Sequence, residues 1–216
     1  MEKTFEEIGK YSRGNPYSRL DWPLRLSEKI IVTPPYGNHS AGENEVVIKI
    51  DSGMAFGTGT HPTTGLCLSM LEDYLNKGDE FLDVGTGSGI LMIAAAKLGA
   101  KRVVGIDKNE TAVEIARRNL ILNKIEGKGV QVMMGNLLDG VKRRFDMVVA
   151  NILTEIVVQL LDDIGRVLKK SGLFICSGMI ERNTHRVVSK MKRLDLEVVE
   201  IRKKAYWVSI AAKQKG

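Results

Sequence analysis

Short apolar runs alternate with amphipathic stretches along most of this chain. The runs have the length of strands and lie at residues 45–50, 81–84, 102–106, 130–134, 145–151 and 173–177. Between them, apolar side chains recur every three or four positions, which predicts helices at residues 63–76, 90–98, 109–123, 154–168 and 183–194. Strands that alternate with helices are typical of an α/β protein with a parallel sheet.

The last two predicted strands, residues 197–202 and 206–212, lie too close together for a crossover helix. They must therefore pair antiparallel. The chain is predicted to form a doubly wound, mostly parallel sheet with a C-terminal antiparallel hairpin. Ligands of such sheets bind at the carboxyl ends of the strands. Four polar or glycine residues are expected at that edge: Gly85, Asp107, Asn136 and Asn151.

The first 44 residues differ in composition from the rest of the chain. They are rich in Gly, Pro, Asn, Ser and Tyr and contain one short apolar stretch at residues 29–33. We interpret residues 1–44 as a short N-terminal extension and linker, with a small β element before Glu45. Residues 45–216 then form one α/β domain, a size that a single hydrophobic core supports.

Composition narrows the class of protein. Hydrophobic residues make up 44% of the chain and charged residues 27%, and no apolar run approaches the eighteen or so residues of a membrane helix. The start lacks the layout of a signal peptide, so we expect a cytoplasmic protein without a membrane partner. Cys67 and Cys176 are too far apart in sequence for a zinc motif, and no metal is expected. Basic residues after residue 189 leave direct RNA contact open without favouring it.

Three alternating glycines, Gly85, Gly87 and Gly89, join the strand at 81–84 to the helix at 90–98. Glycine allows positive φ and lets a ligand approach the backbone closely, while the helix start offers unpaired N–H groups. Asp107 ends the next strand, where ribose hydroxyls would lie. The dinucleotide fingerprint places its third glycine three residues after the second, but here the interval is two. The spacing therefore favours S-adenosylmethionine over NAD.

Residues 52–65 form the most unusual segment of the chain, with four glycines and four threonines around Phe56 and His61. A long glycine-rich loop that leads into a helix is costly in chain entropy unless it closes over something. Thr64 at the helix start can bind a ligand or cap the helix. Asn136 follows the strand at 130–134, within reach of an adenine amino group if that strand neighbours the one at 102–106.

Residues 53–64, the turn at 83–89, residues 105–107 and residues 150–153 together resemble the ribosomal protein L11 methyltransferase (PrmA) family. The resemblance runs from about residue 29 to the C-terminus. It implies a seven-stranded class I methyltransferase fold, S-adenosylmethionine as cofactor, and methyl transfer to lysine or N-terminal amines of ribosomal protein L11. Family members usually carry about a hundred more residues for substrate recognition ahead of this core, so residues 1–44 would be a reduced form of that domain.

The resemblance also implies roles for individual residues. Thr64, Gly85, Asp107 and Asn151 match cofactor-contacting positions, and Phe56, Thr60 and His61 belong to the loop beside the reactive methyl. With Gly87 and Asn136 from the sequence pattern, the expected cofactor site is Phe56, Thr64, Gly85, Gly87, Asp107, Asn136 and Asn151. The expected catalytic residues are Asn151, which would orient the amine, with Thr60 and His61. His61 is either a general base or a shaping residue beside Pro62.

Three alternatives remain open at this point. The acceptor is a different protein lysine, a glutamine or an RNA base; the chain is a nicotinamide-dependent oxidoreductase; or it is a cofactor-binding module without turnover. Enzymes that methylate planar amides or nucleobase amines carry Pro-Pro-aromatic after the Asn, which Ile152-Leu153 does not supply. The glycine spacing opposes the second alternative, and the intact loop at 60–64 opposes the third.

Overall fold

A computed structural model describes residues 22–51 and 59–215 of the chain, so the predicted cofactor residue Phe56 lies outside the described residues. Within these ranges a seven-stranded sheet has the order β6-β5-β4-β7-β8-β10-β9. Its strands are β4 (Glu80–Val84), β5 (Arg102–Asp107), β6 (Val130–Met134), β7 (Phe145–Asn151), β8 (Leu168–Ile180), β9 (Leu196–Lys204) and β10 (Trp207–Gln214).

The pairing of these strands confirms the predicted fold class. β4, β5, β6, β7 and β8 pair in parallel with one another, whereas β10 pairs antiparallel with both β8 and β9. The C-terminal hairpin is thus the antiparallel end of a mostly parallel, doubly wound sheet. β6 lies next to β5, as the assignment of Asn136 requires.

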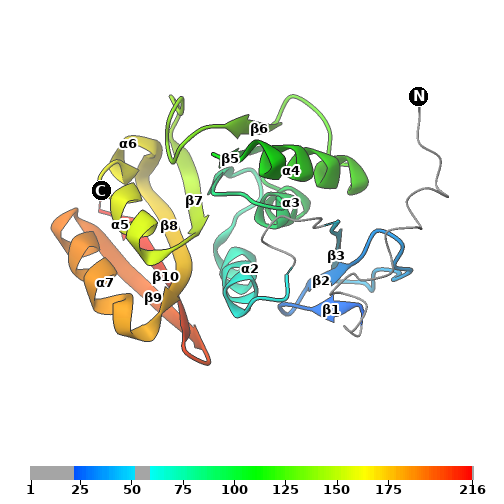
Figure 1. The fold of residues 1–216 in the computed structure, drawn as a ribbon, viewed down its shortest axis with the longest axis horizontal. Helices are drawn as coiled ribbons and strands as arrows, with labels where there is room; N and C mark the ends of the chain where they lie inside the picture. The colour runs from blue at the N-terminus through cyan, green and yellow to red at the C-terminus, as the bar shows by residue number, and fades with distance from the viewer. Residues whose placement is uncertain (1–21, 52–58, 216) are drawn as a thin grey trace.

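Helices cover both faces of the sheet (Figure 1). One face carries α2 (Pro62–Tyr74), α3 (Ile90–Lys97) and α4 (Glu110–Leu122), and the other carries α5 (Thr154–Leu160), α6 (Ile164–Val167) and α7 (Thr184–Arg193), which follows a short 3-10 helix, η3 (Glu181–Asn183). Each layer has its own apolar core. Among the helices that the structure describes, none has the length and apolar character needed to cross a membrane.

A small sheet precedes this domain and packs against α2 and α3 (Figure 1). It has the order β1 (Leu24–Arg25), β2 (Ile30–Thr33) and β3 (Val46–Lys49), with β2 and β3 parallel. Ile30, Val32 and Ile48 are buried in the same core as the residues of α2 and α3. The predicted domain boundary at residue 44 falls between β2 and β3, which pair with each other.

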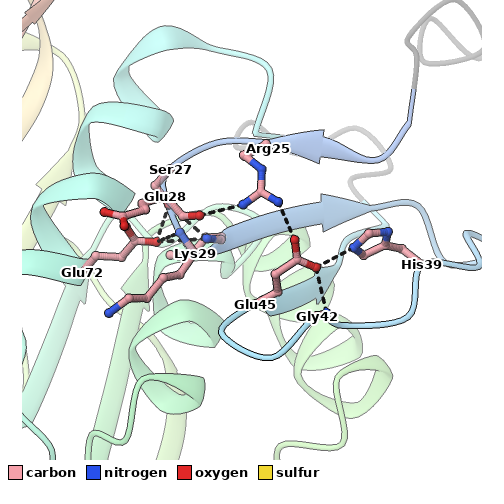
Figure 2. Close-up of polar contacts among 9 residues, drawn as sticks. Arg25, Ser27, Glu28, Lys29, His39, Gly42, Glu45 and Glu72 are labelled. Atoms are coloured by element: carbon pink, nitrogen blue, oxygen red, sulfur yellow. Dashed lines mark hydrogen bonds and ion pairs between the residues drawn. The ribbon is translucent and has the colours of Figure 1, made fainter.

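Glu45 ties together the long connection between β2 and β3 (Figure 2). Its carboxylate accepts a hydrogen bond from the Gly42 amide at 2.9 Å, and it pairs with His39 and with Arg25. The Gly42 N–H, followed by His39 and Arg25, lowers the pKa of Glu45 to about 2. The carboxylate is therefore ionised at any pH at which the protein is normally handled.

Glu72 of α2 fixes the same sheet to the large domain (Figure 2). Its Oε1 atom accepts hydrogen bonds from Ser27 Oγ at 2.6 Å and from the amides of Lys29 and Ile30 at 2.8 and 3.0 Å. One carboxylate oxygen thus accepts hydrogen bonds from the backbone amides at the start of β2. These bonds fix the orientation of β2 relative to α2.

The predicted helix at residues 154–168 is wrong in its second half. The helix ends at Leu160, a single turn follows as α6, and Leu168 already begins β8. Lys169 lies in this strand and contacts Asp146 at 2.8 Å and Glu80 at 3.0 Å, while Leu168 pairs with Phe145. These contacts with β4 and β7 outweigh the local helical pattern.

Candidate functional site

The glycine turn follows β4 at the carboxyl edge of the sheet. Gly85, Gly87 and Gly89 all have positive φ, at 76°, 54° and 80°. The amides of Gly85 and Thr86 donate to the Ile106 carbonyl at 2.8 and 3.0 Å, so the turn is held against the end of β5. The turn therefore presents bare backbone at the carboxyl ends of β4 and β5.

Asp107 ends β5 and contacts this turn directly. Its Oδ2 atom accepts a hydrogen bond from the Gly87 amide at 3.0 Å and its Oδ1 atom accepts one from the Asn109 amide at 2.9 Å. The carboxylate is thereby fixed between the turn and the start of α4. Because a carboxylate offers about four acceptor sites, it can still accept hydrogen bonds from two ligand hydroxyls.

The end of β7 lies close to the same turn. A Cβ atom added to Gly85 would lie 2.5 Å from Ile152 Cγ2, so only glycine fits beside the residue that follows Asn151. Asn151 Oδ1 is buried and has no hydrogen-bond partner among the described residues. An unsatisfied buried amide oxygen costs about 1–3 kcal/mol, which a ligand that donates a hydrogen bond would recover.

Thr64 lies in the first turn of α2 and is completely buried. Its amide donates to the His61 carbonyl at 3.0 Å, but its hydroxyl has no partner within the described part of the chain. The helix is capped instead by His61, whose Nδ1 accepts from the Thr63 amide at 3.4 Å. Thr64 thus keeps a polar group that the fold itself does not use.

His61 caps α2 and also packs against an aromatic ring. Its Nδ1 lies 2.7 Å from Thr63 Oγ1, and its ring stands edge-on to Trp207 with centroids 4.4 Å apart. Burial lowers the pKa of His61, so the imidazole is neutral near pH 7. Thr60, the residue before it, is exposed. The contact with Trp207 brings the start of α2 to the start of β10 at the carboxyl edge of β8.

Asp83 is a functional candidate that sequence reasoning noted only as the start of the turn. It lies in β4, is 1% exposed, and accepts a hydrogen bond from Thr86 Oγ1 at 2.7 Å through Oδ2, while Oδ1 has no described partner. Burial, with a smaller contribution from the charge of Asp107, raises the pKa of Asp83 to about 7. An acid within the apolar run at 81–84 is the signal that could have identified it.

The structure brings three of the predicted site residues together at the glycine turn, namely Gly85, Gly87 and Asp107. A hydrogen bond connects Gly87 with Asp107, and Gly85 lies beside Ile152, the residue that follows Asn151. Asn136 lies just beyond β6 and is exposed, on the far side of β5 from β4.

The chain as a whole is similar to known proteins. The family model of the ribosomal protein L11 methyltransferases (PrmA) matches residues 19–215. The chain belongs to the PrmA family. A PrmA relative named ribosomal protein L11 methyltransferase, from Desulfosudis oleivorans, is 48% identical over 88% of this chain and 64% of its own length. One of the same name from Clostridium perfringens is 41% identical over 99% of this chain and 66% of its own. The chain thus spans slightly less than two thirds of these PrmA relatives.

Solved structures agree with the PrmA assignment. The ribosomal protein L11 methylase from Lactobacillus delbrueckii subsp. bulgaricus matches with a TM-score of 0.84 and 31% identity, over 90% of this chain and 99% of that chain. A methyltransferase from Pyrococcus furiosus, 20% identical, matches with a TM-score of 0.65 over 78% of this chain and 90% of that chain, which shows the shared fold. The fold is that of the class I methyltransferases, as the resemblance implied.

Proposed function

We propose that this chain binds S-adenosylmethionine at the carboxyl edge of β4, β5 and β7 and methylates amine nitrogens of a protein, with ribosomal protein L11 as the acceptor. The observation that carries the proposal is Asn151 Oδ1, a buried acceptor without a described partner beside the glycine turn. The names of the PrmA relatives support the acceptor.

The residues present fit the cofactor. Gly85 and Gly87 allow close approach to the backbone, and Asp107 offers acceptors to ribose hydroxyls. Thr64 supplies a buried hydroxyl at the start of α2. Asn136 beyond β6 is proposed to contact the adenine. Phe56 remains a predicted contact outside the described residues.

When bound, the cofactor supplies an electrophilic methyl group, so a new N–C bond forms as the C–S bond breaks. An amine attacks only as the neutral base, and a lysine amine has a reference pKa of about 10.4. Transfer into a water-poor pocket lowers that pKa. Asn151 Oδ1 then accepts a hydrogen bond from the amine and directs its lone pair at the methyl. Positioning of this kind can supply several kcal/mol of the barrier.

Thr60 and His61 are proposed to shape the pocket beside Asn151. Neutral His61 can accept a proton, but its Nδ1 is engaged by Thr63 in capping α2. His61→Ala therefore distinguishes the two roles. If His61 is the base, the rising limb of the kcat/KM profile shifts in pH; if it only shapes the pocket, the rate falls without a change of profile.

Ligand binding tests the cofactor. S-adenosylhomocysteine is expected to raise the unfolding temperature of the chain, and NAD is not. Stabilisation by NAD alone would refute the methyltransferase proposal and favour an oxidoreductase. Incubation with methyl-labelled cofactor and purified ribosomal protein L11 is expected to label the protein. Labelling of a different protein or of RNA would retain the activity and reject this acceptor.

Asp107→Ala tests the ribose assignment. The variant is expected to weaken S-adenosylhomocysteine binding 10- to 100-fold in calorimetry, because hydrogen bonds to a charged group contribute about 1.5–3 kcal/mol each. Asp79→Ala is the matched control, since Asp79 also accepts a backbone N–H, from Asn76 at 2.8 Å, but lies before β4 at the opposite edge. Equal affinities for the Asp107 variant and the native chain would reject the assignment.

A further inference from the structure

Two asparagines of α4, Asn119 and Asn123, bind the backbone that leaves β3. Asn119 Oδ1 accepts from the Asp51 amide at 2.9 Å and its Nδ2 donates to the Asp51 carbonyl at 3.0 Å. Asn123 does the same for Lys49, with distances of 2.9 and 2.6 Å. Both side chains are buried, at 0% and 8% exposure. The side-chain amides thus replace a neighbouring strand along the edge of this segment.

The spacing of residues along the helix and along the strand explains why the two asparagines match two backbone peptide groups. Residues four apart on a helix are separated by about 6 Å along its axis. Alternate residues of a strand are separated by about 6.6 Å, and their N–H and C=O groups point to the same edge. An i, i+4 pair of asparagines on α4 therefore matches an i, i+2 pair of peptide groups, Lys49 and Asp51.

The asparagines differ in their third hydrogen bond. Asn123 Nδ2 donates to the Asn119 carbonyl of its own helix at 2.8 Å, whereas Asn119 Nδ2 donates to the Ser88 carbonyl in the glycine turn at 2.9 Å. The next amide, Gly89 N–H, donates to the Thr86 carbonyl at 2.9 Å. The peptide group between Ser88 and Gly89 is thus held from both sides, and α4 supplies one of them.

We propose that Asn119 is a positioning residue for the cofactor-binding turn, an inference that rests on the proposed function. It holds the Ser88–Gly89 peptide group and joins it to the backbone of Asp51, which follows β3. Through that peptide group, Asn119 orients Gly87 N–H toward Asp107. Asn123 makes the equivalent bonds to the strand without touching the turn.

The matched variants Asn119→Ala and Asn123→Ala test this role. Each removes three hydrogen bonds from a buried site, so both are expected to lower the urea midpoint of the apo protein by similar amounts. In calorimetry, Asn119→Ala is expected to weaken S-adenosylhomocysteine binding 5- to 20-fold and Asn123→Ala less than 2-fold. In the apo protein, hydrogen exchange of the Gly89 amide is expected to accelerate at least 10-fold in the Asn119 variant only.

Equal affinities in the two variants, or a larger loss in Asn123→Ala, would overturn the proposal. If Asn119→Ala does not fold, Asn119→Ser and Asn123→Ser remove the same bonds with a smaller loss of volume and are held to the same expectations. If the native chain does not bind S-adenosylhomocysteine, the proposed function fails. In that case Gly89 exchange, which needs no ligand, still decides whether Asn119 positions the turn.

Discussion

Asp83 is a carboxyl group in a place where a charge is unfavourable. It is 1% exposed within β4, and its Oδ2 atom accepts a hydrogen bond from Thr86 Oγ1. Because burial raises its pKa to about 7, much of the population carries a neutral carboxylic acid near neutral pH. Neutral Asp83 can donate a hydrogen bond as well as accept one, which an ionised aspartate cannot.

The raised pKa of Asp83 predicts a pH-dependent stability. The unfolded chain loses this proton near the ordinary value of 3.8, whereas the folded chain keeps it until about 7. Its contribution to the free energy of unfolding is therefore full below pH 3.8 and is lost as the pH rises to 7, by an amount on the order of a few kcal/mol. Asp83→Asn removes this dependence.

Urea unfolding of the native chain and of Asp83→Asn gives the difference in their free energies of unfolding. The effect is the change in this difference between pH 5 and pH 8. The native chain is expected to lose stability relative to the variant between the two values. Glu45 does not interfere, since its pKa of about 2 lies below this range. A constant difference between the two proteins would mean that Asp83 ionises normally.

The sequence predicted where some of the site residues lie, but it did not predict the hydrogen bonds that hold the glycine turn. Asp107 and Asn151 end strands, so their place at the carboxyl edge followed from the strand pattern alone. The hydrogen bonds of Asn119 to Asp51 and Ser88 did not follow, because they join positions 68 and 31 residues apart in sequence. For the same reason Asn123 was interpreted only as the residue that closes its helix.

Among the strands, β8 passes unusually close to the end of β7. Gly178 has a φ of 87°, and a Cβ atom there would lie 2.2 Å from the Ile152 carbonyl oxygen. Ser177 pairs with Asn151 in the same register. Glycine at 178 therefore allows the backbone after Asn151 to turn away from the sheet toward α5.

Gly178→Ala is expected to destabilise the fold by about 3 kcal/mol or more, from backbone strain and from overlap with a neighbouring carbonyl. Gly78→Ala is the matched control: its φ is 92°, but no described atom lies within 4 Å of the added Cβ. The control is expected to lose about 1 kcal/mol from strain alone. Equal losses in urea unfolding would show that Ile152 gives way.

The helices and strands were predictable where the local sequence pattern determines them. They were not predictable where contacts with distant residues determine them. The hairpin of β9 and β10 followed from the short connection, and α4 followed from the apolar spacing at 109–123. The start of β8 did not, because apolar spacing at 164–168 also fits a helix. Ion pairs of Lys169 with Glu80 and Asp146 favour the strand, and no local pattern reports them.

Within the described residues, contacts cross the predicted boundary at residue 44. Ile30, Ile31 and Val32 of β2 are buried, and two of them belong to the core of α2 and α3. β3 lies on the other side of the predicted boundary and needs β2 as its parallel partner. The composition of residues 1–44 suggested a linker because Gly, Pro and polar residues outnumber the few apolar residues of β2.

Removal of residues 1–44 is therefore expected to lower the stability of the remaining chain strongly. Burial of three β-branched side chains contributes about 2 kcal/mol each, so about 6 kcal/mol is lost from a domain total of about 5–15 kcal/mol. The shortened chain is expected to lack a cooperative urea transition, measured by circular dichroism. A midpoint equal to that of the full chain would support the division at residue 44.

The place of β10 in the sheet has a consequence for the synthesis of the protein. β10 emerges from the ribosome after every other strand, yet it lies between β8 and β9. Until residues 207–214 are available, β9 has no partner and β8 keeps an open edge. A nascent chain that stalls before Trp207 therefore exposes one unpaired strand, β9, and one open edge, that of β8. Arrested translation products of this protein are thus expected to be prone to aggregation.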